Sequence, residues 1–146
     1  MTDTVEVQQV ASQPIAVVRL RASSQQLSTV VPQGCGTVWN FFKTSQIKAG
    51  RNLAVYLDGQ INLEVGVEVF GPFNGNGQIV YSTTPAGSVL TTAHIGRYDQ
   101  LGKAHEAIRD WSVQHHQSLA GPNWEIYGHW TDDLTQLRTD VYYLLK

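Results

Sequence analysis

The sequence contains one cysteine among its 146 residues, Cys35, so no disulfide can form within the chain. A lack of disulfides is typical of reducing compartments, and we therefore expect a cytoplasmic protein. The N-terminal segment MTDTVEVQQV has neither the basic start nor the apolar stretch of a signal peptide. No apolar run approaches the roughly 20 residues that a membrane-spanning helix needs, so the membrane is not an expected partner.

Charge of either sign is also scarce. Lysine and arginine together number 10, and aspartate and glutamate number 12, which gives a formal net charge of −2. The basic residues form no stripe that would contact phosphates, so we do not expect direct binding to nucleic acid. With 42% hydrophobic residues, the chain has the composition of one globular domain with a sizeable core.

Common catalytic and cofactor motifs are missing as well. The sequence has no Gly-x-Ser-x-Gly elbow, and GPFNGNG at 71–77 lacks the lysine and the following helix of a phosphate-binding loop. It has no paired cysteines and no His-Glu-x-x-His motif, and the adjacent His115 and His116 diverge on a helix. We therefore expect no metal and no cofactor. Cys35 is either an exposed thiol between glycines or, as is commoner for a lone cysteine, a small buried residue.

The hydrophobic pattern predicts strand, helix, strand and strand in the first half of the chain. The helix is expected from about Thr37 to a stop at Gly50, because Gly34 and Gly36 weaken its start. Asp58-Gly59 is typical of a hairpin turn between the two strands that follow the helix. The segments with strand patterns lie at 5–20, with a break at Pro14, and at 52–57, 61–71 and 78–83.

The second half repeats this order, with strands expected at 88–98, 124–130 and about 138–145. A helix is expected from Asp99, which can cap it, to about Leu119, before the stop signal Ala-Gly-Pro. We therefore predict a single domain with an α+β fold of duplicated strand-helix-strand-strand units, with half-repeats at about 5–83 and 84–146. Their antiparallel sheets would pair about a pseudo-two-fold axis, with both helices on one face and a ligand cleft at the midline of the other.

The stretch WEIYGHW at 124–130 places one carboxylate among large aromatic residues. Side chains alternate along a strand, so Trp124, Ile126 and Trp130 share one face, and Glu125 and Tyr127 share the other. We expect the first set to anchor the strand under the helices. The second set is either the solvated side of the sheet or part of a pocket, where Glu125 would attract an organic cation or act as a general base.

Other aromatic residues and one histidine are candidates for the same cleft. Tyr98 and Tyr142 are expected to border it, whereas Tyr143 is assigned to the core by its apolar neighbours two positions away. His94 shares a strand face with Tyr98, so its alternatives are a pocket residue and a half-exposed sheet histidine. Trp39 either reaches over the rim of the cleft from the first helix or packs on the sheet.

Segments of both halves resemble one known family. HIGRY at 94–98, GPNWEIYG at 121–128 and LRTDVYYLL at 137–145 are similar to the GyrI-like small-molecule-binding domain. The segment VGVEVFGPF at 65–73 stands where that family has an alternating strand, so the resemblance covers nearly the whole chain. The same domain is the effector-binding part of some multidrug-sensing regulators of the MerR and AraC types.

The resemblance implies a midline pocket in which Glu125 meets cationic, lipophilic ligands among aromatic side chains. It also implies that Tyr98 and Tyr142 line this pocket, and that Tyr127 follows Glu125 on the same face. Some stand-alone relatives resemble hydrolases of cyclopropane-containing alkylating natural products, in which a glutamate and a tyrosine assist water. Others are similar to a gyrase-inhibiting protein.

We therefore expect a stand-alone binder or sensor of amphipathic, aromatic and cationic small molecules, such as drugs or toxins. Nothing before Val5 matches a helix-turn-helix, so we do not expect the chain to read DNA bases by that route. The alternatives are a hydrolase in which Glu125 and Tyr98 are catalytic, and a protein inhibitor of a topoisomerase. The chain is expected as a monomer or as a homodimer formed through an edge strand.

Overall fold

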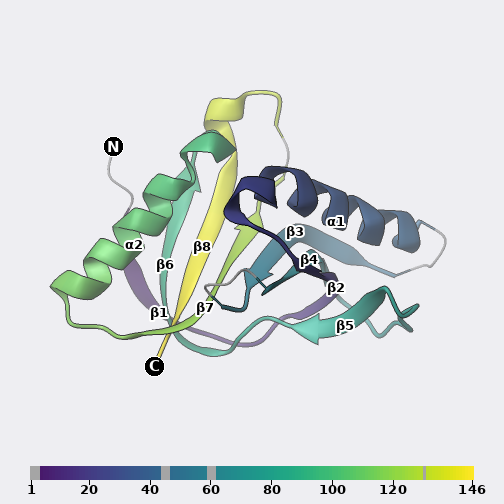
Figure 1. The fold of residues 1–146 in the computed structure, drawn as a ribbon, viewed down its shortest axis with the longest axis horizontal. Coiled ribbons are helices and arrows are strands. Elements are labelled where there is room, and N and C mark those ends of the chain that lie inside the picture. Colours follow the sequence, from purple (N-terminus) through teal and green to yellow (C-terminus); the bar gives the residue numbers. More distant parts are fainter. Residues whose placement is uncertain (1–3, 44–46, 59–61, 130) are drawn as a thin grey trace. The chain divides into compact units, whose positions relative to one another are not determined.

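The computed structural model describes residues 4–43, 47–58, 62–129 and 131–146. The chain divides into two compact units (Figure 1). The first unit is Ser12–Pro85, and the second unit joins the N-terminal strand to Ala86–Lys146. Each combines antiparallel strands with a helix, so the α+β prediction is confirmed.

In the first unit, α1 lies between β2 and β3 in the chain, and the sheet has the order β3-β4-β2-β5. Backbone pairing of Leu57 with Asn62 continues the β3–β4 hairpin, while Gly59 of the expected turn lies outside the described residues. The elements are β2 (Pro14–Arg21), α1 (Leu27–Phe42), β3 (Ala49–Tyr56), β4 (Asn62–Val69) and β5 (Ile79–Thr83), with a 3-10 turn at Ser24–Gln26.

In the second unit, α2 lies between β6 and β7, and the sheet has the order β7-β8-β6-β1. The elements are β1 (Glu6–Val10), β6 (Gly87–Ile95), α2 (Gly102–Gln114), β7 (Leu119–Tyr127) and β8 (Arg138–Leu145), with 3-10 turns at Tyr98–Gln100 and Leu134–Gln136. Strand, helix, strand and strand therefore recur in the same order in both units, as predicted. The N-terminal strand differs from the expected half-repeats, because Glu6 pairs with Thr91 of β6.

The boundaries of α1 differ from the prediction. The helix begins at Leu27, about ten residues before Thr37, and it ends at Phe42, so Gly50 belongs to β3. Gly34 lies inside it, and a Cβ atom there would sit 2.8 Å from Cγ1 of Val65. The low helix propensity of glycine is overridden here, because the missing side chain lets the helix lie close to the sheet.

The expected ends of α2 were also wrong. Asp99 lies in the 3-10 turn before α2, and its side chain does not cap the helix, whose N-cap is Leu101. The helix ends at Gln114, and the Gly-Pro pair at 121–122 lies inside β7. The pairing of β7 with β8 shifts register between Leu119 and Asn123. Such an irregularity accommodates a proline, which cannot donate to the ladder.

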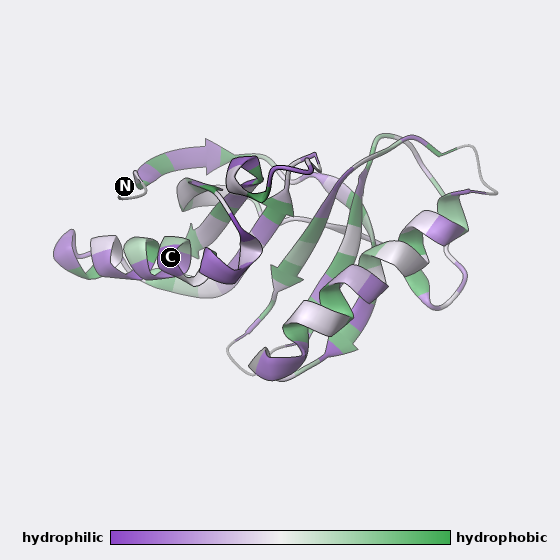
Figure 2. Ribbon diagram, turned by 90° about the horizontal axis from the view of Figure 1, so that it is seen from above, coloured by the Kyte–Doolittle hydropathy of each residue, from purple (hydrophilic) through white to green (hydrophobic). Residues whose placement is uncertain are grey.

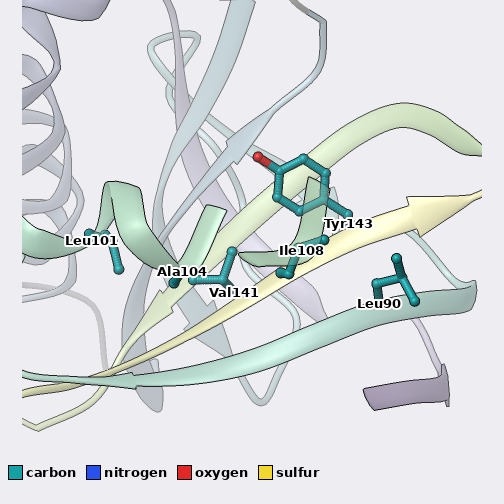
Figure 3. Packing of buried hydrophobic residues seen from close by; sticks show 6 residues of the cluster. All are labelled: Leu90, Leu101, Ala104, Ile108, Val141 and Tyr143. Carbon is teal, nitrogen blue, oxygen red and sulfur yellow. The ribbon is translucent and has the colours of Figure 1, made fainter. Parts of the chain in front are cut away.

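The core of the second unit forms where α2 crosses β6 and β8 (Figure 3). Leu101, Ala104 and Ile108 are buried against the sheet. The sheet contributes Leu90, Val141 and Tyr143. Both hydrophilic and hydrophobic residues are found along the helices (Figure 2), as expected for helices with one buried side. In the described part of the chain, no helix is long and apolar enough to span a membrane.

A pair of alanine substitutions in α1 tests the close approach of this helix to the sheet. A Cβ at Gly34 would press on Val65 and Val18, whereas a Cβ at Gly36 meets nothing within 4 Å. We expect Gly34→Ala to lower the free energy of unfolding by about 1–3 kcal/mol through overpacking. Gly36→Ala should raise it by about 0.5–1 kcal/mol through helix propensity. Urea unfolding measures both, and equal shifts would contradict the packing argument.

Candidate functional site

Strand β7 places Glu125 on the face of its sheet that α2 covers. Glu125 pairs in register with Val141, and Val141 belongs to the core under α2. Tyr127, two residues further, packs at the edge of that core. Glu125 and Tyr127 therefore share a face, as predicted, but the expectation that this face lies opposite the helix was wrong.

The aromatic side of β7 faces away from α2. Trp124 pairs in register with Tyr142, and their rings stack with centroids 5.2 Å apart and planes 12° from parallel. Trp124 is only 2% exposed. The prediction that it anchors β7 under the helix is nevertheless wrong, because it lies on the other face of the sheet. Trp130, the last member of the predicted anchor, lies outside the described residues.

Glu125 receives hydrogen bonds from two side chains. The hydroxyl of Tyr127 donates to its Oε1 at 2.6 Å, and Nε2 of His105 lies 2.6 Å from its Oε2. His105 is on the sheet-facing side of α2, one residue after the buried Ala104. Glu125 is 5% exposed. The solvated interpretation of this carboxylate is therefore wrong, because the protein replaces water with its own donors.

Hydrogen bonds continue on the other side of the His105 ring. Nδ1 of His105 lies 2.6 Å from the hydroxyl of Tyr143, and Arg109 donates to the same hydroxyl at 3.1 Å. With one ring proton on Nε2, every contact has one donor and one acceptor: Arg109 to Tyr143, Tyr143 to His105, and His105 to Glu125. A continuous set of hydrogen bonds thus joins the carboxylate to a guanidinium. We call these residues, together with Tyr127, the Glu125 network.

Two tyrosine rings pack against each other beside the Glu125 network. The rings of Tyr98 and Tyr127 meet edge to face with centroids 5.8 Å apart. Tyr98 is 42% exposed, so it presents an accessible aromatic surface next to the partner of Glu125. Burial raises the pKa of Tyr98. Burial also raises the pKa of Tyr143, with Arg109 opposing the shift. Both hydroxyls therefore keep their protons at neutral pH.

The other predicted site residues lie elsewhere. Tyr142 faces away from Glu125, so the two do not border one cleft on the same face of the sheet. It lines a hollow of about 970 Å³ that also reaches His94. His94 is buried, and its Nε2 lies 3.1 Å from the carbonyl of Arg97. Trp39 belongs to the first unit, where it donates to Oδ1 of Asn52 at 2.6 Å, and its role at a ligand stays a prediction.

Sequence reasoning missed His105 and Arg109 and treated Tyr143 as core alone. One signal was available, because His105 and Arg109 are four residues apart and such residues share a helix face. A second signal was the hydroxyl of Tyr143, since a buried tyrosine usually finds a partner for its polar end. In Figure 3 this hydroxyl points away from Leu90, while the ring itself packs in the core.

Other buried reactive groups have structural partners. In the first unit, Glu64 contacts Arg19 at 2.9 Å and accepts from Ser82, and Glu68 contacts Arg51 at 3.0 Å. These carboxylates balance permanent cations, whereas Glu125 meets a titratable ring. Among the described residues, no group of three histidine, cysteine or acidic side chains is arranged to hold a metal ion.

The environment of Cys35 makes it a poor nucleophile. The side chain is 5% exposed, and its sulfur lies 3.5 Å from the carbonyl oxygen of Gly66. Burial raises the pKa of its thiol to about 11, so the reactive thiolate is scarce at neutral pH. The alternative of a small buried residue is therefore confirmed.

A family model for the GyrI-like small molecule binding domain matches residues 3–146. The chain belongs to this family. The GyrI-like chain is similar in fold to the C-terminal domain of EcmrR, with a TM-score of 0.83 and 17% identity over 100% of this chain and 99% of that domain. It matches 58% of the longer EcmrR chain in a complex with DNA. No curated protein matches it by sequence.

The GyrI-like chain is also similar in fold to two further proteins. SAV2435, solved with bound tetraphenylphosphonium, has a TM-score of 0.70 and 13% identity over 98% of this chain and 94% of that one. A hydrolase from Listeria innocua has a TM-score of 0.62 and 8% identity over 99% of this chain and 93% of that one. At such identities the likeness concerns the fold alone.

Removing one hydroxyl tests whether the Glu125 network is formed in solution. Tyr143→Phe leaves Nδ1 of His105 and the guanidinium of Arg109 without their shared partner. We expect the free energy of unfolding to fall by about 1–3 kcal/mol, the cost of an unsatisfied buried polar group. Tyr98→Phe is the control, since this side chain is 42% exposed and should lose little. Equal effects in urea unfolding would contradict the network.

Proposed function

We propose that the GyrI-like chain binds amphipathic, aromatic and cationic small molecules at Glu125. The observation that carries the proposal is a buried carboxylate joined to Tyr127, whose ring touches the half-exposed Tyr98. The fold of SAV2435, which was solved with tetraphenylphosphonium, supports it, because that ligand is a lipophilic cation built from aromatic rings. The midline cleft expected from the sequence stays a prediction.

Two attractions would act on such a ligand. The negative charge of Glu125 acts over several ångströms, and a site with little water screens it weakly. The faces of Tyr98 and Tyr127 add cation–π attraction, worth about 0.5–2 kcal/mol for each well-placed ring. Neither attraction requires the ligand to carry hydrogen-bond donors at fixed positions, so the site should accept ligands of varied shape.

Replacing the carboxylate with an amide tests the charge of the site. Glu125→Gln keeps the size and an acceptor oxygen but removes the charge. We expect the affinity for tetraphenylphosphonium to fall about 10- to 100-fold, equivalent to about 1.4–2.8 kcal/mol. The affinity for triphenylphosphine oxide, a neutral molecule with similar rings, should change less than about threefold. Titration calorimetry measures both.

A matched control removes the same charge from the surface of α2. Glu106 is exposed and lies on the same helix as His105, so Glu106→Gln changes the net charge equally without touching the network. This variant should bind both probes as the wild type does. Equal losses for the cation and the neutral probe in Glu125→Gln would contradict the proposed role of the charge.

A hydrolase is the second candidate, and the Glu125 network favours it. The carboxylate would take a proton from the water that forms a C–O bond to a cyclopropane carbon. A ring C–C bond would break, and its electron pair would move into the conjugated carbonyl, to which the hydroxyl of Tyr98 would donate. The structural likeness to a Listeria innocua hydrolase adds support from the fold. A cyclopropane conjugated to a dienone needs little activation, so few catalytic groups would suffice.

Turnover separates this candidate from simple binding. We expect a hydrolase to form many equivalents of ring-opened product from a cyclopropane-containing alkylating agent, with Glu125→Gln losing most of this activity. Mass spectrometry of the product against protein concentration measures the turnover number. Protection of the agent at one equivalent, without product, would exclude hydrolysis and leave binding as the function.

A further inference from the structure

The partner of Glu125 is a group that can itself carry positive charge. Nε2 of His105 and Oε2 of Glu125 are 2.6 Å apart, and their side chains are 15% and 7% exposed. The site therefore contains an internal cation in one protonation state of the ring and none in the other. An external cation and a protonated His105 would neutralise the same carboxylate.

The surroundings of His105 satisfy its ring in both protonation states. In the neutral state, Nε2 donates to Glu125 and Nδ1 accepts from the hydroxyl of Tyr143. In the protonated state, Nδ1 also donates, and the oxygen of Tyr143 accepts from it as well as from Arg109. A hydroxyl can make this exchange by rotating its proton. The charge of His105 can thus change without leaving a ring nitrogen unpaired.

Charged and titratable groups on several elements contact His105 directly or lie beyond its partners. The carboxylate of Glu125 lies on one side of the ring, and the guanidinium of Arg109 lies beyond Tyr143 on the other side. The guanidinium contacts Tyr143, whereas protonation of His105 would place a positive charge on the ring whose Nε2 lies 2.6 Å from the carboxylate. The groups are Glu125 and Tyr127 from β7, Tyr143 from β8, and Arg109 from α2 itself, with Tyr98 packed on Tyr127 and His94 on the same sheet face.

We infer that His105 determines the specificity of the site for cations by competing with them for Glu125. The inference rests on the proposed binding function. Protonated His105 neutralises the carboxylate and leaves a cationic ligand without its counter-charge. When a cation binds, Nδ1 of His105 loses its proton to the solvent, while Nε2 keeps its proton and its bond to Glu125. Neutral aromatic ligands do not need the charge, so they bind in either state.

This competition links cation binding to pH. A proton and a ligand that exclude each other must each weaken the binding of the other, so cation affinity falls as the pH falls. If one group must lose its proton before the cation binds, affinity falls by at most about tenfold for each pH unit over which that group becomes protonated. The affinity for a neutral ligand stays constant over the same range.

Calorimetry with tetraphenylphosphonium tests the inference on the full chain. This cation has no titratable group, so any proton exchanged on binding comes from the protein. Titrations between pH 5.5 and pH 8 in buffers of different ionisation enthalpy give the number of protons released at each pH. We expect each bound cation to release up to one proton within this range, and we expect weaker binding at pH 5.5 than at pH 8. Triphenylphosphine oxide should release none.

Two variants identify the source of the proton. His105→Gln places an amide N–H near Oε2 of Glu125 but cannot take up a proton, so it should release none and bind the cation equally at pH 5.5 and 8. His115→Gln is the matched control on the same helix, since His115 is exposed and contacts the carbonyl of Trp111. It should release protons as the wild type does. Thermal melting checks that each variant is folded.

The possible results separate this inference from the function on which it rests. Binding of the cation by the wild type without proton release would overturn the role of His105 and leave the binding function intact. Proton release that persists in folded His105→Gln would also overturn it. A wild type that does not bind tetraphenylphosphonium at any pH contradicts the proposed function itself. The proton count needs only the wild type, so it stands even if His105→Gln does not fold.

Discussion

The packing of α2 on its sheet determines both the core of the second unit and the environment of Glu125. Ala104 and Ile108 pack on the apolar part of the sheet, and His105, between them in the sequence, reaches Glu125. Sliding the helix by one turn, about 5.4 Å, would separate the ring from the carboxylate and the apolar stripe from its partners. Apolar packing and polar pairing thus fix the same position of α2. The carboxylate can be buried because this position supplies its donors.

The two units use the same arrangement of elements for different chemistry. In each, a side chain of the helix makes a hydrogen bond to the strand that follows the helix. In the first unit this pair is Trp39 and Asn52, both neutral, at 2.6 Å. In the second unit it is His105 and Glu125, which can carry charge. The two contacts lie at different ends of their helices, since Trp39 is in the last turn of α1 and His105 is in the first turn of α2. The residues that make each contact decide whether it can carry charge.

Much of the fold follows from local patterns. Alternation and turn signals predicted the repeated order of elements, and the segments around GPNWEIYG predicted the family, which the family model confirms. The predicted ends of the helices were wrong where packing overrides helix propensity. Gly34 lies inside α1 because a side chain there would collide with Val65, and no local rule contains that contact. The Gly-Pro pair after α2 was read as a stop but lies in an irregular part of β7.

The sequence by itself determined that Glu125 and Tyr127 share one face of a strand and that Trp124 lies on the other. A period of two residues follows from strand geometry alone, so it holds in any fold. Which face the helix covers depends on contacts between segments far apart in the chain, and here only the tertiary structure decided it. The same reason applies to His105, Arg109 and Tyr143. Their hydrogen bonds span 20 to 38 residues of sequence, and they exist because α2 crosses the strands that carry their partners.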